Sequence, residues 1–265
     1  MAAATAAGNF LPARSKETLC ECLFCCDIDI RTICAYNGVN MQFETPYTAP
    51  TLTVDAVIFQ LSPEGLKVLL VRRSQEPFKD RWAVPGGYNA AGYTTMEALR
   101  AVVKRKAGVD IDKSLGYIEQ LYTFDTIARD PRGHAVSVTY MGCGRDIEFA
   151  DGSEHTELVS IDDLPPLAYD HKEIITYARA RLAAKLGYTN AVHALLSPKF
   201  TLTQLQSAYE AVFGRTFDKR NFRKKFLSLG LIHETNETWR DGAHRPAKLY
   251  EFNSTQLETL SRSFD

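Results

Sequence analysis

One segment of the chain, residues 85–109, reads PGGYNAAGYTTMEALRAVVKRKAGV, and its pattern determines the architecture that we expect. A double glycine leads through a polar loop into an amphipathic helical segment. Thr94 and Glu97 have the spacing of a capping box, which marks the start of a helix, and Gly108 is a typical stop. The segment therefore predicts a glycine turn followed by a capped helix.

The segments on either side predict a mixed α/β domain over residues 43–187. Two β-branched, apolar runs before the glycines are separated by a turn and form a hairpin. Two further strands follow the helix, and a second helix begins after Asp170, which is placed to cap it, and ends at Gly187. The expected strands and this second helix are residues 51–61, 66–74, 117–126, 134–142 and 171–187.

A second, smaller domain is expected over residues 190–255. Its two helices carry hydrophobic residues at helical spacing, and Asp218 and Gly230 mark the ends of the second one. Two helices followed by a two-stranded wing are typical of a winged helix-turn-helix domain. The helices and strands are expected at residues 201–213, 218–230, 231–235 and 247–252.

The two ends of the chain lie outside these domains. Residues 1–42 are predicted to be an unstructured leader, and residues 256–265 a tail. Five of the six cysteines lie between Cys20 and Cys34, but their spacing does not give two CxxC pairs and no histidine is near, so we interpret them as reduced thiols. Met41 stands just before the first patterned segment and is a candidate natural start.

The composition is that of an ordinary soluble globular protein, with 45% hydrophobic residues, 24% charged residues and a net charge of −1. Nothing global indicates nucleic acid or membrane, so a binding surface for either must be local. No apolar run approaches the roughly 18 residues that a membrane span requires. We therefore expect a cytoplasmic protein that does not bind a membrane.

The spacing in residues 85–109 is that of the Nudix hydrolase signature, which is G, five residues, E, seven residues, then R-E-U-x-E-E-x-G-U with U aliphatic. Gly87 falls on the first glycine, Gly108 on the last glycine and Val109 on the final aliphatic position. The chain over residues 51–183 therefore resembles the Nudix fold.

The acidic residues of that signature are missing. Tyr93 stands at the early glutamate, Ala101 and Val102 replace the R-E pair, and Arg105 and Lys106 replace the E-E pair. The family's carboxylates hold Mg²⁺ or a similar hard cation, which takes oxygen ligands. We therefore predict no metal site, no catalytic residues and no hydrolysis. Single carboxylates that could still supply a base are Glu119, Glu148, Glu154 and Glu157.

Loss of catalysis leaves ligand binding open, because cationic side chains can supply the charge that a metal brings to a diphosphate. Arg73 is a better candidate than the basic run of the helix, since it ends a strand beside the glycine loop. For each candidate a structural role is the alternative: a solvated helix face, a turn, a core aromatic or an arginine in a surface hairpin. The predicted ligand-binding residues are Arg72, Arg73, Trp82, Gly86, Gly87, Lys106 and Arg129.

Basic residues gather on the second helix and the wing of the smaller domain. Phe222 and Phe226 fix the buried face of the helix, so most of its cations lie outside. Such a helix suits the major groove of DNA, where phosphates give affinity and a few side chains read base edges. The alternative is a small domain that contacts proteins. The predicted DNA-binding residues are Arg215, Lys219, Arg220, Arg223, Lys224, Arg240, His244 and Arg245.

A Nudix-like domain followed by a winged helix resembles the NrtR family of bacterial transcriptional regulators. Segments similar to that family's, in its order, are TVDAVIF (53–59), KVLLVRRS (67–74), PF…W…PGGY (77–88), RDPRG (129–133), AYDH (168–171) and RPAKLY (245–250). The resemblance implies a homodimeric repressor of NAD-metabolism genes that binds a double-stranded DNA operator. It also implies an effector, ADP-ribose or a related nucleotide, and no cofactor.

Two other functions remain open from the sequence. An active Nudix hydrolase of ADP-ribose-like substrates would need unorthodox metal ligands. A sugar-responsive regulator of the same architecture would differ only in the chemistry of its pocket.

Overall fold

The computed structural model describes residues 48–149, 152, 154–240 and 246–260 of the 265-residue chain. The predicted leader over residues 1–42 lies outside the described residues. The helices are α2 (Thr95–Ala107), α3 (Ile111–Ser114), α4 (His171–Tyr188), α5 (Leu202–Phe213) and α6 (Lys219–Ser228), with a 3₁₀ helix η2 (Ala191–Leu195). The strands are β1 (Thr51–Ser62), β2 (Gly65–Arg72), β3 (Trp82–Ala83), β4 (Gly86–Tyr88), β5 (Tyr117–Phe124), β6 (Ala135–Cys143), β7 (His155–Ser160), β8 (Ile232–Trp239) and β9 (Ala247–Phe252).

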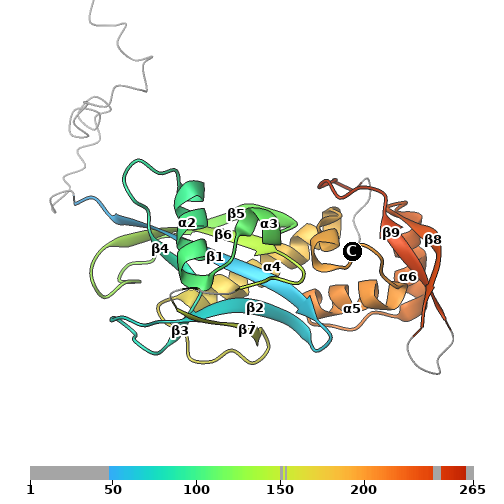
Figure 1. Cartoon of the computed structure of the whole chain (residues 1–265), viewed down its shortest axis with the longest axis horizontal. Helices are drawn as coiled ribbons and strands as arrows, with labels where there is room; N and C mark the ends of the chain where they lie inside the picture. The colour runs from blue at the N-terminus through green and yellow to red at the C-terminus, as the bar shows by residue number, and fades with distance from the viewer. Residues whose placement is uncertain (1–47, 150–151, 153, 241–245, 261–265) are drawn as a thin grey trace, which may run out of the picture. The chain divides into compact units, whose positions relative to one another are not determined.

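A mixed sheet forms the centre of the larger domain (Figure 1). Strand β1 lies in its middle and pairs with β2, β4 and β6. The strand order is β3-β2-β1-β6-β5, with β4 paired to β1 and β7 paired to β2. Strands β1 and β6 are parallel, and the other pairs are antiparallel. The mixed α/β domain that the sequence predicts is confirmed.

The alternation of side chains along β1 separates two hydrophobic cores. Val57 and Phe59 point into the larger core with residues of α4, whereas Ala56 and Ile58 point into a second core with residues of α2. Successive side chains of a strand face opposite sides of the sheet. Helices α2 and α4 therefore cover opposite faces of β1 (Figure 1).

Helix α2 is bounded by the residues that the sequence indicates. The Thr94 side chain accepts a hydrogen bond from the Glu97 amide, the Glu97 side chain accepts one from the Thr94 amide, and both halves of the capping box are present. Gly108 ends the helix in the left-handed conformation with φ 72°, which glycine adopts without steric cost. The predicted helix is confirmed.

Helix α4 differs from the prediction at both ends. Asp170 occupies the N-cap position, but its side chain makes no capping hydrogen bond; the carboxylate binds Arg129 instead. Gly187 does not end the helix, which continues to Tyr188. Thr189 closes the last turn, because its amide and its hydroxyl both donate to the carbonyl of Lys185.

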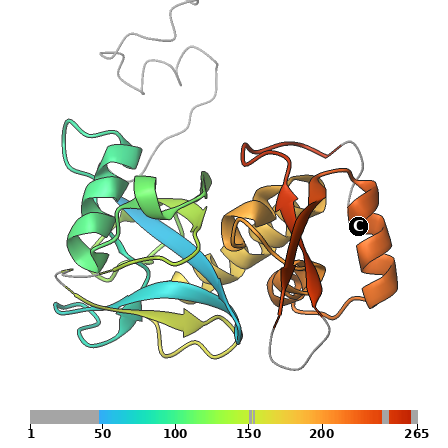
Figure 2. The same ribbon diagram turned by 45° about the vertical axis from the view of Figure 1, so that its right-hand side comes forward.

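The smaller domain contains the predicted helix-turn-helix and wing. Helix α5 begins with a second capping box, formed by Thr201 and Gln204, and the Asp218 side chain caps α6. Tyr209 of α5 and Phe222 and Phe226 of α6 pack together with ring centroids 5.4–6.0 Å apart. The wing strands β8 and β9 lie side by side (Figure 2).

Strand β8 is longer than the five residues expected. After a register shift between Glu234 and Thr238, the strand resumes pairing with β9 through Thr238 and Trp239. The polar sequence of residues 236–239 gives no strand signal, and this segment is a strand because Thr238 and Trp239 pair with β9. Five short elements were also absent from the prediction, namely α3, η2, β3, β4 and β7.

Candidate ligand cavity and nucleic-acid interface

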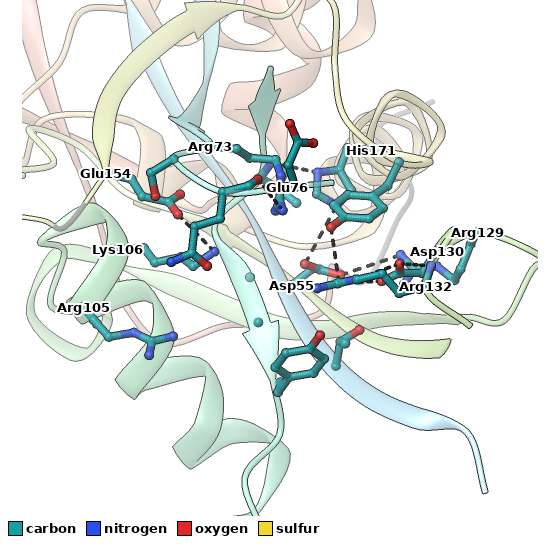
Figure 3. A pocket seen from close by; sticks show the side chains of 18 residues that line it. Asp55, Arg73, Glu76, Arg105, Lys106, Arg129, Asp130, Arg132, Glu154 and His171 are labelled. Carbon is teal, nitrogen blue, oxygen red and sulfur yellow. Dashed lines mark hydrogen bonds and ion pairs between the residues drawn. The ribbon is translucent and has the colours of Figure 1, made fainter. Parts of the chain in front are cut away.

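A cavity of about 410 Å³ opens beside the double glycine. Its walls come from β1, β4, the last turn of α2, the segments around residues 73–76 and 129–132, and the start of α4 (Figure 3). This volume is within the range of small-molecule sites. The predicted residues that line it are Arg73, Gly86, Gly87, Lys106 and Arg129.

Arg72 and Trp82 do not line this cavity, so we leave them out of the candidate site. The two residues face each other across the β2–β3 pair. Arg72 extends to Asp80, with 3.7 Å between Nη2 and Oδ1, and Trp82 packs against the larger hydrophobic core. Since neighbouring strand residues point to opposite faces, Arg73 reaches the cavity and Arg72 does not.

The double glycine belongs to a strand and not only to a turn. Gly86 and Gly87 pair with Asp55 and Val54 of β1. A Cβ atom at Gly86 would lie 1.7 Å from Asp55 Oδ1, and one at Gly87 would lie 3.3 Å from the Val102 methyl groups. The glycines therefore allow the backbone of β4 to approach both a buried carboxylate and helix α2.

Positive charge gathers where α2 ends at the cavity. Lys106 Nζ lies 3.5 Å from Glu154 Oε1. Burial lowers the pKa of Lys106, the Glu154 carboxylate opposes that shift, and the nearby charge of Arg73 and Arg105 lowers the pKa further. Across the described part of the chain, no carboxylate lies within ion-pair distance of Arg73 or Arg105. The cavity therefore presents two arginines that an anionic ligand can neutralise.

A buried polar network forms the floor on the opposite side. Arg129 donates two hydrogen bonds to the Asp170 carboxylate, at 2.9 and 2.8 Å, and its Nη2 lies 3.8 Å from Asp55 Oδ2. Ser137 donates a hydrogen bond to the same Asp55 oxygen. One guanidinium thus faces two carboxylates, and its side chain is only 5% exposed.

His171 joins this network through its ring. Its Nδ1 accepts a hydrogen bond of 3.1 Å from the Val84 amide, so the neutral ring carries its proton on Nε2, which faces Asp55 Oδ1 at 4.0 Å. Burial lowers the pKa of His171, while Asp55 and Asp170 oppose the shift. The protein therefore holds this histidine neutral at pH values where an exposed one is charged.

Replacing His171 with asparagine is expected to flatten the acid side of the stability profile. Below about pH 6.5 the unfolded chain takes up a proton on His171 that the folded chain does not, so stability falls as pH decreases, by at most ~1.4 kcal/mol per unit. His171→Asn removes the titration and can keep an acceptor for the Val84 amide. Urea unfolding between pH 7 and 5 measures the slope. His134→Asn, at an exposed site, is the control; an equal change of slope in both variants would contradict the assignment.

The residues at the positions of the Nudix carboxylates supply no carboxylate oxygen for a cation. Val102 packs into the second core, and Arg105 and Lys106 line the cavity. Among the described residues, no three His, Cys, Asp or Glu side chains form a group that could hold a metal ion. A divalent cation at the end of α2 would face like charges.

Helix α6 carries the basic surface of the smaller domain. Phe222 and Phe226 are buried, whereas Lys219, Arg220 and Lys224 are exposed. Arg223 is half-buried and donates to Thr203 Oγ1 at 2.9 Å. The remaining predicted residues lie elsewhere: the Arg215 guanidinium lies over the rings of Phe213 and Phe217, Arg240 is exposed, and His244 and Arg245 are outside the described residues.

Comparison with known proteins agrees with this division of the chain. Residues 51–178 match the model of the Nudix domain, and residues 192–252 match that of the NrtR DNA-binding winged helix domain. The ADPR responsive transcriptional repressor NtrR of Acinetobacter baylyi is 34% identical over 219 residues, which cover 79% of this chain and 84% of that protein. The chain belongs to the NrtR family. The family and fold that the sequence predicts are confirmed.

A solved NrtR structure extends the comparison to three dimensions. The crystal structure of Shewanella oneidensis NrtR with a 27mer DNA superposes with a TM-score of 0.66 at 30% identity. The match covers 81% of this chain and 99% of that one. The similarity therefore includes both the Nudix domain and the winged helix of NrtR.

The Nudix domain of this NrtR-family chain is also similar to an enzyme. ADP-ribose pyrophosphatase of Methanocaldococcus jannaschii is 33% identical over 132 residues, which cover 49% of this chain and 73% of that protein.

In the described residues of our chain, no helix is long and apolar enough to cross a bilayer.

Sequence reasoning missed the polar network of this NrtR Nudix domain. Asp55, Asp130, Arg132, Tyr169 and His171 all line the cavity, and none of them is among the predicted ligand-binding residues, although Arg132 belongs to the RDPRG segment noted in the sequence. A usable signal was Asp55 itself, since a carboxylate in the apolar segment TVDAVIF must find partners when that strand is buried.

Proposed function

We propose that this protein is a transcriptional repressor that releases its operator when its Nudix domain binds ADP-ribose, and that it does not hydrolyse this ligand. The observation that carries the proposal is the replacement of the Nudix carboxylates by Arg105 and Lys106 at a cavity that Arg73 also lines. These side chains suit a diphosphate and repel a metal. The regulator from Acinetobacter baylyi is described as ADPR responsive, which supports the choice of ligand.

The operator complex is proposed to contain a homodimer. Winged helices commonly bind two half-sites, and a two-fold operator suits a two-fold protein. Genes of NAD metabolism are the expected targets, from the family resemblance. The division between a Nudix domain ending at residue 187 and a winged helix starting at residue 190 is likewise our proposal.

Helix α4 provides a route from the cavity to the DNA-binding domain. Its first residue, His171, lines the cavity. Farther along, Arg179 donates to the carbonyls of Val212 and Ala211 at the end of α5, and the Leu186 carbonyl accepts from the Tyr209 hydroxyl. A ligand that binds two positions of α4 unequally would therefore shift the winged helix.

The direct test is DNA footprinting with and without ADP-ribose. We expect protection of a palindromic site that is lost as ADP-ribose is added, with NAD and a pentose as the competing effectors. Unchanged protection at saturating ADP-ribose would remove the proposal, and release by the pentose alone would favour a sugar-responsive regulator. A thermal-shift screen of the same ligands reports binding independently, since a ligand of the folded state raises the melting temperature.

An active hydrolase is the second candidate, and the similarity to ADP-ribose pyrophosphatase favours it. Its residual acid near α2 would be Glu154, which is paired with Lys106. Incubation with ADP-ribose and Mg²⁺ or Mn²⁺ separates the two functions. Efficient release of AMP and ribose phosphate would establish the hydrolase; intact ligand after many hours is the expected result.

A further inference from the structure

Glu154 is a buried acid in the cavity, and one of its carboxylate oxygens has no hydrogen-bond partner among the described residues. Its side chain is 8% exposed and lines the cavity. Oε1 faces Lys106 at 3.5 Å, but Oε2 is buried and has no hydrogen-bond partner among the described residues. Buried acceptors are normally satisfied, so an unpaired one in a cavity points to a donor that arrives with a ligand.

The surroundings of Glu154 decide which ligand group suits it. Its amide donates to the Lys106 carbonyl at 3.1 Å, which fixes the residue against the end of α2. A carboxylate only accepts hydrogen bonds. A phosphate brings only acceptors and cannot satisfy Oε2, whereas a sugar hydroxyl brings the missing donor.

The rest of the cavity orients such a ligand. Tyr88 and Tyr169 lie around Arg132, whose guanidinium is 5.4 Å from the Tyr88 ring centre and donates to the Tyr169 hydroxyl at 3.3 Å. Figure 3 shows Arg132 and Glu154 on opposite sides of the cavity. Aromatic rings suit a base at one end, and Arg73, which reaches between the two sides (Figure 3), suits the phosphates. The end at Lys106 and Glu154 is left for the group beyond the phosphates.

We propose that Glu154 accepts a hydrogen bond from a hydroxyl of the distal ribose and thereby selects ADP-ribose over nucleotides that end in a phosphate. This inference rests on the proposed function and names the part of the effector that the protein recognises. Lys106 holds the carboxylate in place and, with Glu154, forms the distal-ribose subsite. A ligand without that ribose leaves Oε2 unsatisfied and brings a terminal phosphate towards it.

The test measures the affinities of ADP-ribose and ADP for the full chain by calorimetric titration. The wild type is compared with Glu154→Gln and with the control Glu157→Gln. Glu157 is an exposed residue of β7 that does not line the cavity. We expect the wild type and the control to prefer ADP-ribose. In Glu154→Gln, the affinity for ADP-ribose should fall about tenfold or more, because a neutral amide replaces the charged acceptor, while ADP binds equally or better.

The ratio of the two affinities separates the outcomes. A merely structural Glu154 would weaken both ligands alike and leave the ratio unchanged, which overturns the inference. An ADP-ribose analogue with hydrogens in place of the distal hydroxyls provides a second measurement on the wild type alone; equal affinity for the analogue overturns the inference even if the variant does not fold. A wild type that binds neither nucleotide rejects the proposed function itself, and Glu154 with it.

Discussion

Replacing Arg129 with methionine is expected to lower the free energy of unfolding by about 3–5 kcal/mol, because the change leaves two buried carboxylates without their cation. The Arg129 side chain is 5% exposed and pairs with Asp170 at 2.8 Å. Its second neighbour, Asp55, is 8% exposed and lies 3.8 Å away. Methionine fills much of the space of the aliphatic stem but supplies neither charge nor donors.

The matched control is Arg72→Met, which removes the same group from a surface site. Arg72 is 52% exposed and lies 3.7 Å from an exposed Asp80. Surface ion pairs of this kind contribute about 0–1 kcal/mol. Urea unfolding at one pH and salt concentration gives the free energy of unfolding of both variants. If the two variants lose stability to the same extent, within about 0.5 kcal/mol, the buried network does not stabilise the domain.

The same network explains why part of the site could not be found from the sequence. Asp170 stands directly before a helix, where a cap is the default interpretation of an aspartate. Its use by Arg129, 41 positions earlier in the chain, depends on how the sheet brings the two segments together. Local pattern identifies the residue type and the element, but the choice between two local roles is made by tertiary contacts.

The elements that were predicted well have boundaries that are set by residues within or next to the element itself. Helices α2, α5 and α6 are bounded by cap residues and glycines that act over one turn. Strands β3, β4 and β7 depend instead on pairing with β1 and β2. Gly86 and Gly87 show the consequence, because read alone they indicate a turn. Only the approach of Asp55 shows that a side chain would not fit at position 86, and the approach of Val102 shows that one at position 87 would be tightly packed.

Replacing three cations of α6 together, as Lys219→Gln, Arg220→Gln and Lys224→Gln, is expected to lower operator affinity by about 10²-fold or more at low salt. Each phosphate contact that is lost removes counterion release, so the slope of log affinity against log salt should shrink by roughly 0.9 per contact. Fluorescence anisotropy at several salt concentrations measures both quantities. ADP-ribose binding to the Nudix domain should be unchanged.

The positions of these charges in α6 indicate that they serve binding to a partner and not the stability of the helix. No acidic residue occurs in the first turn of α6, which begins with Lys219 and Arg220. Cations at a helix N-terminus oppose the helix dipole at a cost of about 0.3–1 kcal/mol each, so the triple variant should melt at the same temperature as the wild type or slightly higher. A variant that is at least as stable and yet binds DNA weakly separates the binding surface from the fold.

A control with the same change of net charge decides whether position or total charge matters. Lys79, Lys104 and Lys172 are exposed on the Nudix domain, and their replacement by glutamine also removes three positive charges. We expect at most a twofold change in operator affinity and an unchanged salt slope, because a charge beyond the Debye length of about 8–10 Å is largely screened. Equal losses in the two triple variants would mean that α6 does not contact the phosphates, and the DNA-binding surface would have to lie elsewhere on the winged helix.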